Sequence, residues 1–94
     1  MANPQRFGRT PGAAAGVVDG ETVVVSPSDL RYHALNPAAT AVWELLADGT
    51  TVDDAVAELT SRFDVDEQTC RRDVETCLEN FAAIGIATPL DTDH

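Results

Sequence analysis

The sequence predicts an α+β fold in which a three-stranded antiparallel sheet is followed by a bundle of three helices. Two observations lead to this prediction. β-branched residues gather between positions 17 and 25, with turn-forming residues between the runs. After position 36, apolar residues recur at helical spacing in three successive segments. The chain has 94 residues, enough for one hydrophobic core, and we therefore expect a single domain.

The first two strands are expected to form a hairpin. The runs 16–18 and 21–25 are rich in valine and flank the dipeptide Asp19-Gly20. Asp and Gly tolerate the positive φ angles that a two-residue hairpin turn requires. This pattern predicts that the two strands pair directly on either side of residues 19–20.

A second turn, over residues 26–29, leads into a third expected strand over residues 30–35. Pro27 and the short polar side chains around it favour a turn. In the strand, Leu30, Tyr32 and Ala34 alternate with the residues between them, and this period of two is typical of a half-buried strand. We expect the third strand to lie at an edge of the sheet.

Three helices are predicted after the sheet. The first begins at Pro37, which follows the capping residue Asn36, and extends to about residue 48. The second begins at Thr51, where Thr51 and Asp54 are spaced as in a capping box, and the third runs from residue 67 to about residue 84 after the cap Asp66. This order of elements is winged-helix-like. The residues expected to face the core are Ala38, Val42, Leu45 and Leu46 with Trp43 beside them, then Val52, Ala55, Val56, Leu59 and Phe63, and finally Cys70, Val74, Cys77, Leu78, Phe81 and Ile84.

Both ends of the chain are expected to lie outside the domain. Residues 1–12 contain two Pro, two Gly and two Arg but one large apolar residue, so burial would not offset the entropy lost on ordering them. Residues 88–94 are polar and include a Pro. We therefore expect a flexible arm over 1–12, a domain over 13–87 and a flexible tail over 88–94.

The composition argues against several classes of function. Six basic residues against sixteen acidic ones give a net charge of −10, which would repel a phosphate backbone. A winged-helix protein that reads DNA would place its second or third helix in the major groove. Here both of these helices carry more acidic than basic residues. No stretch approaches the roughly 20 apolar residues of a membrane span. We expect a cytoplasmic protein that binds neither nucleic acid nor membranes.

Neither catalysis nor metal binding is expected. Cys70 and Cys77 are seven residues apart on one predicted helix, so their Cα atoms would lie about 10 Å apart, too far for a disulfide. Two Cys and two His do not provide a closely spaced set of zinc ligands. Nucleophilic catalysis would also need an oxyanion loop near a nucleophile and a base, and the sequence has no such loop. We expect both thiols to be reduced and buried, and we expect no cofactor.

The third strand offers a candidate binding site. An edge strand has unpaired backbone N–H and C=O groups, and it is either protected or used to accept a partner strand. Arg31, Tyr32 and His33 have side chains that can both pack against a ligand and bond to it. Alternatively, Tyr32 covers the helices while Arg31 and His33 are solvated. The residues by themselves leave both interpretations open.

The end of the third strand and the helices carry a series of short motifs. These are Leu35-Asn36-Pro37-Ala38-Ala39, Val42-Trp43-Glu44-Leu45-Leu46 and Asp48-Gly49-Thr50-Thr51-Val52-Asp53-Asp54-Ala55-Val56, then Leu59, Phe63, Asp73, Val74, Leu78, Phe81, Gly85 and Ile86. In this order they resemble the PqqD-like family of recognition elements for precursor peptides. Within the family, the segment from Arg31 to Asn36 is most similar to the stand-alone proteins that recognise lasso-peptide leaders.

The resemblance implies a non-catalytic domain that binds the leader of a ribosomally synthesised and post-translationally modified peptide (RiPP). It would deliver the precursor to a leader peptidase or another modifying enzyme. The leader would add as a strand to residues 30–35 and lie in a groove beside the third helix. A PqqD-type peptide chaperone for a radical SAM enzyme and a winged-helix DNA-binding or adaptor domain remain as alternatives. The residues implied to bind the peptide are Leu30, Arg31, Tyr32, His33 and Ala34 from the strand and Arg71, Val74 and Leu78 from the helix.

Overall fold

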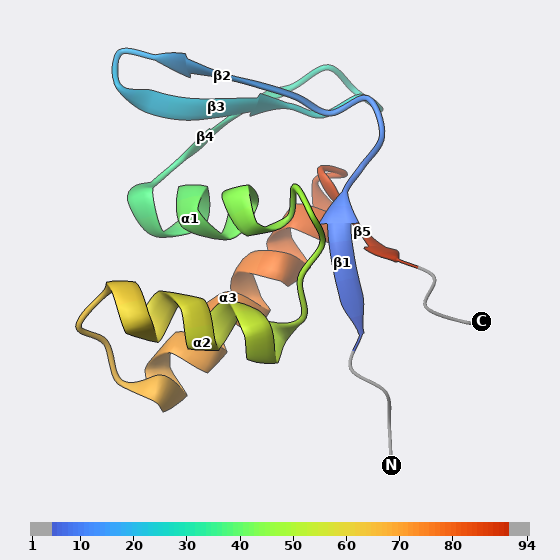
Figure 1. Ribbon diagram of the computed structural model, residues 1–94. Helices are drawn as coiled ribbons and strands as arrows, with labels where there is room; N and C mark the ends of the chain where they lie inside the picture. Colours follow the sequence, from blue (N-terminus) through green and yellow to red (C-terminus); the bar gives the residue numbers. More distant parts are fainter. Residues whose placement is uncertain (1–4, 91–94) are drawn as a thin grey trace.

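Five strands and three helices form an α+β fold in the computed structural model, which describes residues 5–90. A three-stranded sheet lies over the first helix, and the other two helices pack on the remaining sides of that helix (Figure 1). This arrangement confirms the predicted fold class. The sheet comprises β2 (Ala14–Val18), β3 (Glu21–Val25) and β4 (Tyr32–Leu35), and the helices are α1 (Pro37–Leu45), α2 (Val52–Arg62) and α3 (Glu67–Ala83).

The three-stranded sheet is antiparallel and has the order β2-β3-β4. The predicted hairpin joins β2 to β3, with φ angles of 53° at Asp19 and 82° at Gly20. Val24 of the central strand pairs with Ala15 on one side and with His33 on the other. Because directly paired residues share a face and Val24 is fully buried, this row of the sheet points toward the helices.

The third strand starts later than predicted, at Tyr32. Leu30 lies outside β4, with a φ of 59° in a turn closed by a 2.9 Å hydrogen bond from its N–H to the carbonyl oxygen of Ser26. Leu35 is buried, so His33 on the same face points inward while Tyr32 and Ala34 point to solvent. The alternation in the sequence did not determine which set faces inward, because a shift of one residue reverses every side chain of a strand.

Each helix begins at the predicted capping residue. The side chains of Asn36, Thr51 and Asp66 accept hydrogen bonds from the backbone N–H groups of Ala39, Asp54 and Thr69, at 2.8, 3.0 and 3.1 Å. The first helix ends at Leu45, before the predicted residue 48, since the following turn tightens to bonds between residues three apart. Within residues 5–90, no helix is long and apolar enough to cross a membrane.

The two ends of the described chain pair with each other. The strand β1 (Arg6–Arg9) is antiparallel to β5 (Ala87–Leu90), and the two lie side by side in Figure 1. Phe7 also exchanges backbone hydrogen bonds with Thr50, at 2.8 and 2.9 Å. The expected flexible arm and tail are therefore wrong at residues 6–9 and 88–90. The amino-acid composition of each segment does not indicate the strand with which it pairs. Residues 1–4 and 91–94 lie outside the described residues.

Trp43 joins the paired ends to the helical core. The guanidinium carbon of Arg9 lies 4.2 Å from the centre of the Trp43 ring, and Arg9 Nη2 donates a 2.9 Å hydrogen bond to the Trp43 carbonyl oxygen. On α3, Phe81 meets the indole edge to face, with ring centres 6.4 Å apart. Trp43 is only 3% exposed, so the ring that the sequence placed beside the apolar stripe belongs to the core. The other large, fully buried side chains are Leu46, Leu78, Ile86, Val24 and Val74.

We predict that Trp43→Ala lowers the free energy of unfolding by about 3 to 5 kcal/mol, because it removes a buried aromatic ring and leaves a cavity. Trp43→Phe keeps a ring against Phe81 and Arg9 and should cost much less. Urea denaturation of the three proteins, followed by circular dichroism, measures both losses. A loss below about 1 kcal/mol for Trp43→Ala would contradict a core role.

Candidate functional site

The outer edge of β4 is open. Within residues 5–90, β4 pairs with β3 and with no other strand. The N–H of Ser26 donates a 3.0 Å hydrogen bond to the carbonyl oxygen of Arg31, so the backbone of Arg31 is turned toward the β3 side. Alternate residues of a strand turn their backbone groups to opposite edges. It follows that Tyr32 and Ala34 direct their N–H and C=O groups to the open edge.

A groove of about 610 Å³ begins where β4 ends. It runs between the start of α1 and one face of α3, and the C-terminal end of α2 with the segment after it closes one end. Its volume is in the range of sites that hold a side chain or a small ligand. The apolar lining residues are Ala38, Ala39, Val42, Leu59, Phe63, Val65, Val74 and Phe81, and the polar ones are Asn36, Arg72, Asp73, Thr76 and Asn80.

Both cysteines line this groove as free thiols. Cys70 is buried, whereas Cys77 is partly exposed, so the prediction of two buried thiols is correct for Cys70 and wrong in degree for Cys77. Burial raises the pKa of Cys77 to about 11, and burial, reinforced by Asp73, also raises the pKa of Cys70. Neutral thiols of this kind act as small apolar groups in the groove wall. Residues 5–90 contain no group of three or more potential metal ligands.

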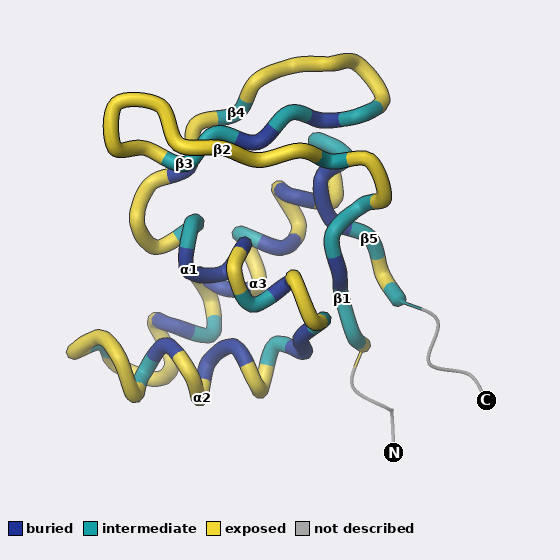
Figure 2. Tube along the Cα trace, turned by 45° about the horizontal axis from the view of Figure 1, so that its top comes forward, coloured by how far each residue is buried: buried dark blue, intermediate teal, exposed yellow. Residues whose placement is uncertain are grey.

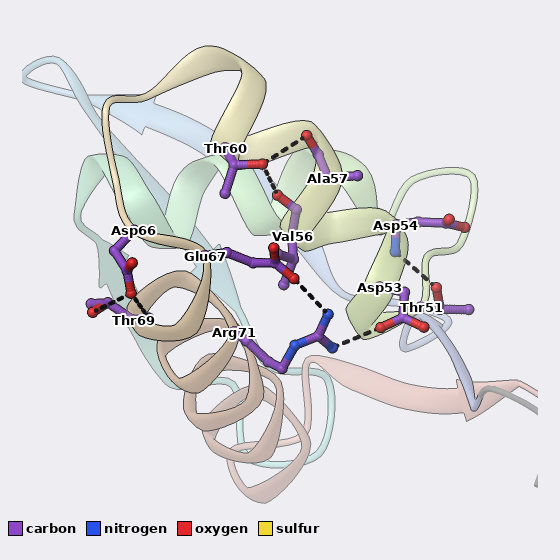
Figure 3. A network of polar contacts seen from close by, with 10 residues as sticks. All are labelled: Thr51, Asp53, Asp54, Val56, Ala57, Thr60, Asp66, Glu67, Thr69 and Arg71. Atoms are coloured by element: carbon purple, nitrogen blue, oxygen red, sulfur yellow. Dashed lines mark hydrogen bonds and ion pairs between the residues drawn. The ribbon is translucent and has the colours of Figure 1, made fainter.

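The structure separates the three residues that were expected on α3. Val74 lines the groove, but Leu78 is fully buried in the core and is not part of its wall. Arg71 lies on another side of α3, where its guanidinium meets Asp53 Oδ1 of α2 at 2.7 Å and Glu67 at 3.6 Å (Figure 3). The cation that lines the groove is the neighbouring Arg72.

Arg72, Thr76 and Asn80 form a row at spacings of four residues, which places them on one side of a helix. None of these three residues is among those that the sequence predicted to bind a peptide. The spacing was visible in the sequence, but the side of α3 that faces the groove was not.

The expected strand residues also have different environments. Tyr32 and Ala34 point to solvent on the outer face of the sheet, and Leu30 is exposed in the turn. Arg31 is exposed and lies 3.7 Å from the Asp29 carboxylate. His33 faces the helices, and within residues 5–90 its Nε2 is the buried side-chain polar atom without a hydrogen-bond partner. β4 therefore contributes an open backbone edge, and its side chains do not line the groove.

An open strand edge that ends at an apolar groove defines a class of small α+β domains suited to an extended ligand. Residues 21–87 match the family described as Coenzyme PQQ synthesis protein D (PqqD). The match spans more than half of the chain, so the chain belongs to the PqqD family. A comparison with curated proteins finds no significant match.

Two solved structures are similar to this fold. One, described as "Lasso peptide synthetase B1 complexed with the leader peptide", has 25% sequence identity and a TM-score of 0.78, and the match covers 88% of this chain and 98% of the other. The second, "TbiB1 in Complex with the TbiA(beta) Leader Peptide", has 21% identity and a TM-score of 0.74, with coverages of 84% and 93%. Both of those proteins are bound to leader peptides.

We predict slow alkylation of both thiols in the folded protein. With a pKa of about 11, Cys77 is thiolate in only about one molecule in a thousand at pH 8, and the thiolate is the reactive form. The rate at Cys77 should rise about tenfold per pH unit up to pH 10, and Cys70 should react more slowly because it is buried. Mass spectrometry after iodoacetamide treatment separates the two sites. Rapid labelling of Cys77 with a midpoint near pH 9 would contradict its burial.

Proposed function

We propose that this chain is a non-catalytic domain that binds the leader region of a RiPP precursor peptide, of the lasso type, as an added strand on β4. The observation that carries this proposal is the open edge of β4 leading into the groove between α1 and α3. Membership of the PqqD family supports it, as does the similarity to two proteins in complex with leader peptides.

The strand edge supplies affinity that depends little on the leader sequence. Backbone groups of Tyr32 and Ala34 would bond to a leader strand lying beside β4. Alternate leader residues would then point in opposite directions, toward the helices or toward the outer face of the sheet. The leader residues that point toward the helices are the ones that can enter the groove.

The groove supplies specificity. Val42, Phe63 and Phe81 offer a lining for a bulky apolar leader side chain. Arg72 lies on the polar side of the groove and can pair with an acidic leader residue or a leader carbonyl. Compared with the residues chosen from the sequence, this proposal keeps Val74, replaces Arg71 by Arg72 and leaves Leu78 in the core.

Delivery to an enzyme completes the proposed function. The lasso-type interpretation pairs the chain with a leader peptidase, and the family match also favours a PqqD-type chaperone that presents its peptide to a radical SAM enzyme. The neighbouring genes distinguish these cases. A transglutaminase-like peptidase and an asparagine-synthetase-like cyclase beside a short precursor gene would support the lasso type, whereas a radical enzyme would support the other.

We predict that leader binding depends on the leader backbone with a period of two. Only alternate leader N–H groups would face β4, so N-methylation at those positions removes a bond worth about 1 kcal/mol or more. Binding should weaken by about fivefold or more at these positions and much less between them. Fluorescence anisotropy of a labelled leader, competed by an N-methyl series, gives the pattern. Uniform insensitivity or a helical period would exclude strand addition.

We predict that filling the groove weakens leader binding. Ala38→Trp places a large side chain in the groove from the exposed first turn of α1, and we expect the Kd for the leader to rise at least tenfold, about 1.4 kcal/mol. Ala57→Trp makes the same change at an exposed site on α2 that does not line the groove. Isothermal titration with the leader compares the two. Equal affinities would show that the groove is not used.

A further inference from the structure

The outer face of the three-stranded sheet is uncovered and almost entirely apolar. No helix lies on the side of the sheet away from α1 in the described part of the chain (Figure 1). Strand register and the inward position of Val24 determine which side chains point outward. These are Ala14, Gly16 and Val18 from β2, Val23 and Val25 from β3, and Tyr32 and Ala34 from β4, with Glu21 as the charged exception at the hairpin end.

This composition differs from that of an ordinary solvent-facing sheet. Antiparallel sheets with one wet face usually alternate apolar residues inside with polar residues outside. Here Tyr32 is 77% exposed and Val18 is 57% exposed, and the valines of the central strand lie between them. In Figure 2 the strand β2 is exposed along its length, whereas β3 is mostly intermediate or buried. A contiguous apolar patch of this kind marks an interaction surface more often than scattered apolar residues do.

Charge favours a different protein over a second copy as the occupant of this face. The chain has a net charge of −10, and Asp19 and Glu21 add acidic groups at the hairpin end of the patch. Two copies packed through this face would each bring a net charge of −10, and like-charge repulsion would oppose their association. A complementary partner has an apolar surface bordered by Arg or Lys.

We propose that the outer face docks the enzyme that processes the bound precursor, through an apolar surface with a basic border. This inference rests on the proposed leader binding. A leader strand on β4 would direct its alternate side chains onto the same face, beside Tyr32 and Ala34. The patch and the leader would then form one continuous surface, so the enzyme would contact this chain and its own substrate together. Such a surface recruits the enzyme more strongly when the leader is bound.

The test uses the precursor peptide and the leader peptidase encoded with this chain. Val18→Glu puts a charge on the outer face, and Val17→Glu makes the identical change one residue earlier, on the opposite face of β2, where Val17 is 73% exposed. Val23→Thr adds a hydroxyl at the centre of the patch while keeping a β-branched residue suited to a strand. For each variant, leader affinity is measured by anisotropy, and cleavage of the precursor is followed by mass spectrometry.

We expect Val18→Glu and Val23→Thr to keep leader Kd values within twofold of the original chain and to slow leader cleavage at least about tenfold, while Val17→Glu affects neither. Normal cleavage by both outer-face variants would overturn the docking proposal while leaving leader binding intact. An equal loss with Val17→Glu would also overturn it. Absence of leader binding by the unaltered chain would instead refute the proposed function. A dimer in sedimentation that Val18→Glu disrupts would assign the face to a second copy and overturn the proposal.

Discussion

The contact of Trp43 with Arg9 and Phe81 is the interaction on which the rest of the structure depends. It links three elements that are distant in sequence: β1 at one end of the chain, α1 in the middle and α3 near the other end. The hydrogen bonds from Arg9 to the Trp43 carbonyl oxygen couple the pairing of β1 and β5 to the position of α1. Because α1 begins directly after β4, this contact also helps to place the open edge against the groove.

The two adjacent arginines of α3 lie in different environments. Arg71 binds Asp53 and Glu67, and its hydrogen bond with Asp53 raises the pKa of the guanidinium, consistent with a role in holding α2 against α3. Such exposed ion pairs contribute little to stability, so the apolar contacts between the two helices remain dominant. Arg72, about 100° further around the helix, lies on the groove instead.

β4 provides the proposed site with three separate functions. Its backbone offers an open edge, its inward side chains Leu35 and His33 attach it to the helical layer, and Tyr32 and Ala34 extend the apolar outer face. The period of two keeps these functions apart within four residues. Alternate side chains of a peptide bound at the edge would likewise point in opposite directions, one set to the groove and the other to the outer face.

Local chemistry was enough to predict the hairpin at Asp19-Gly20 and the three helix caps, since a turn or a cap depends on residues within a few positions of each other. The resemblance of motifs along the helices led to the family that the match over residues 21–87 then established. Tertiary structure decided the pairing of the chain ends, the phase of β4 and the arginine that lines the groove. β1 and β5 pair because two distant segments satisfy each other's backbone groups, and the burial of Leu35 set the phase of β4. The packing of α2 against α3 determined that Arg72, and not Arg71, reaches the groove, because helical periodicity defines faces but not which neighbour each face meets.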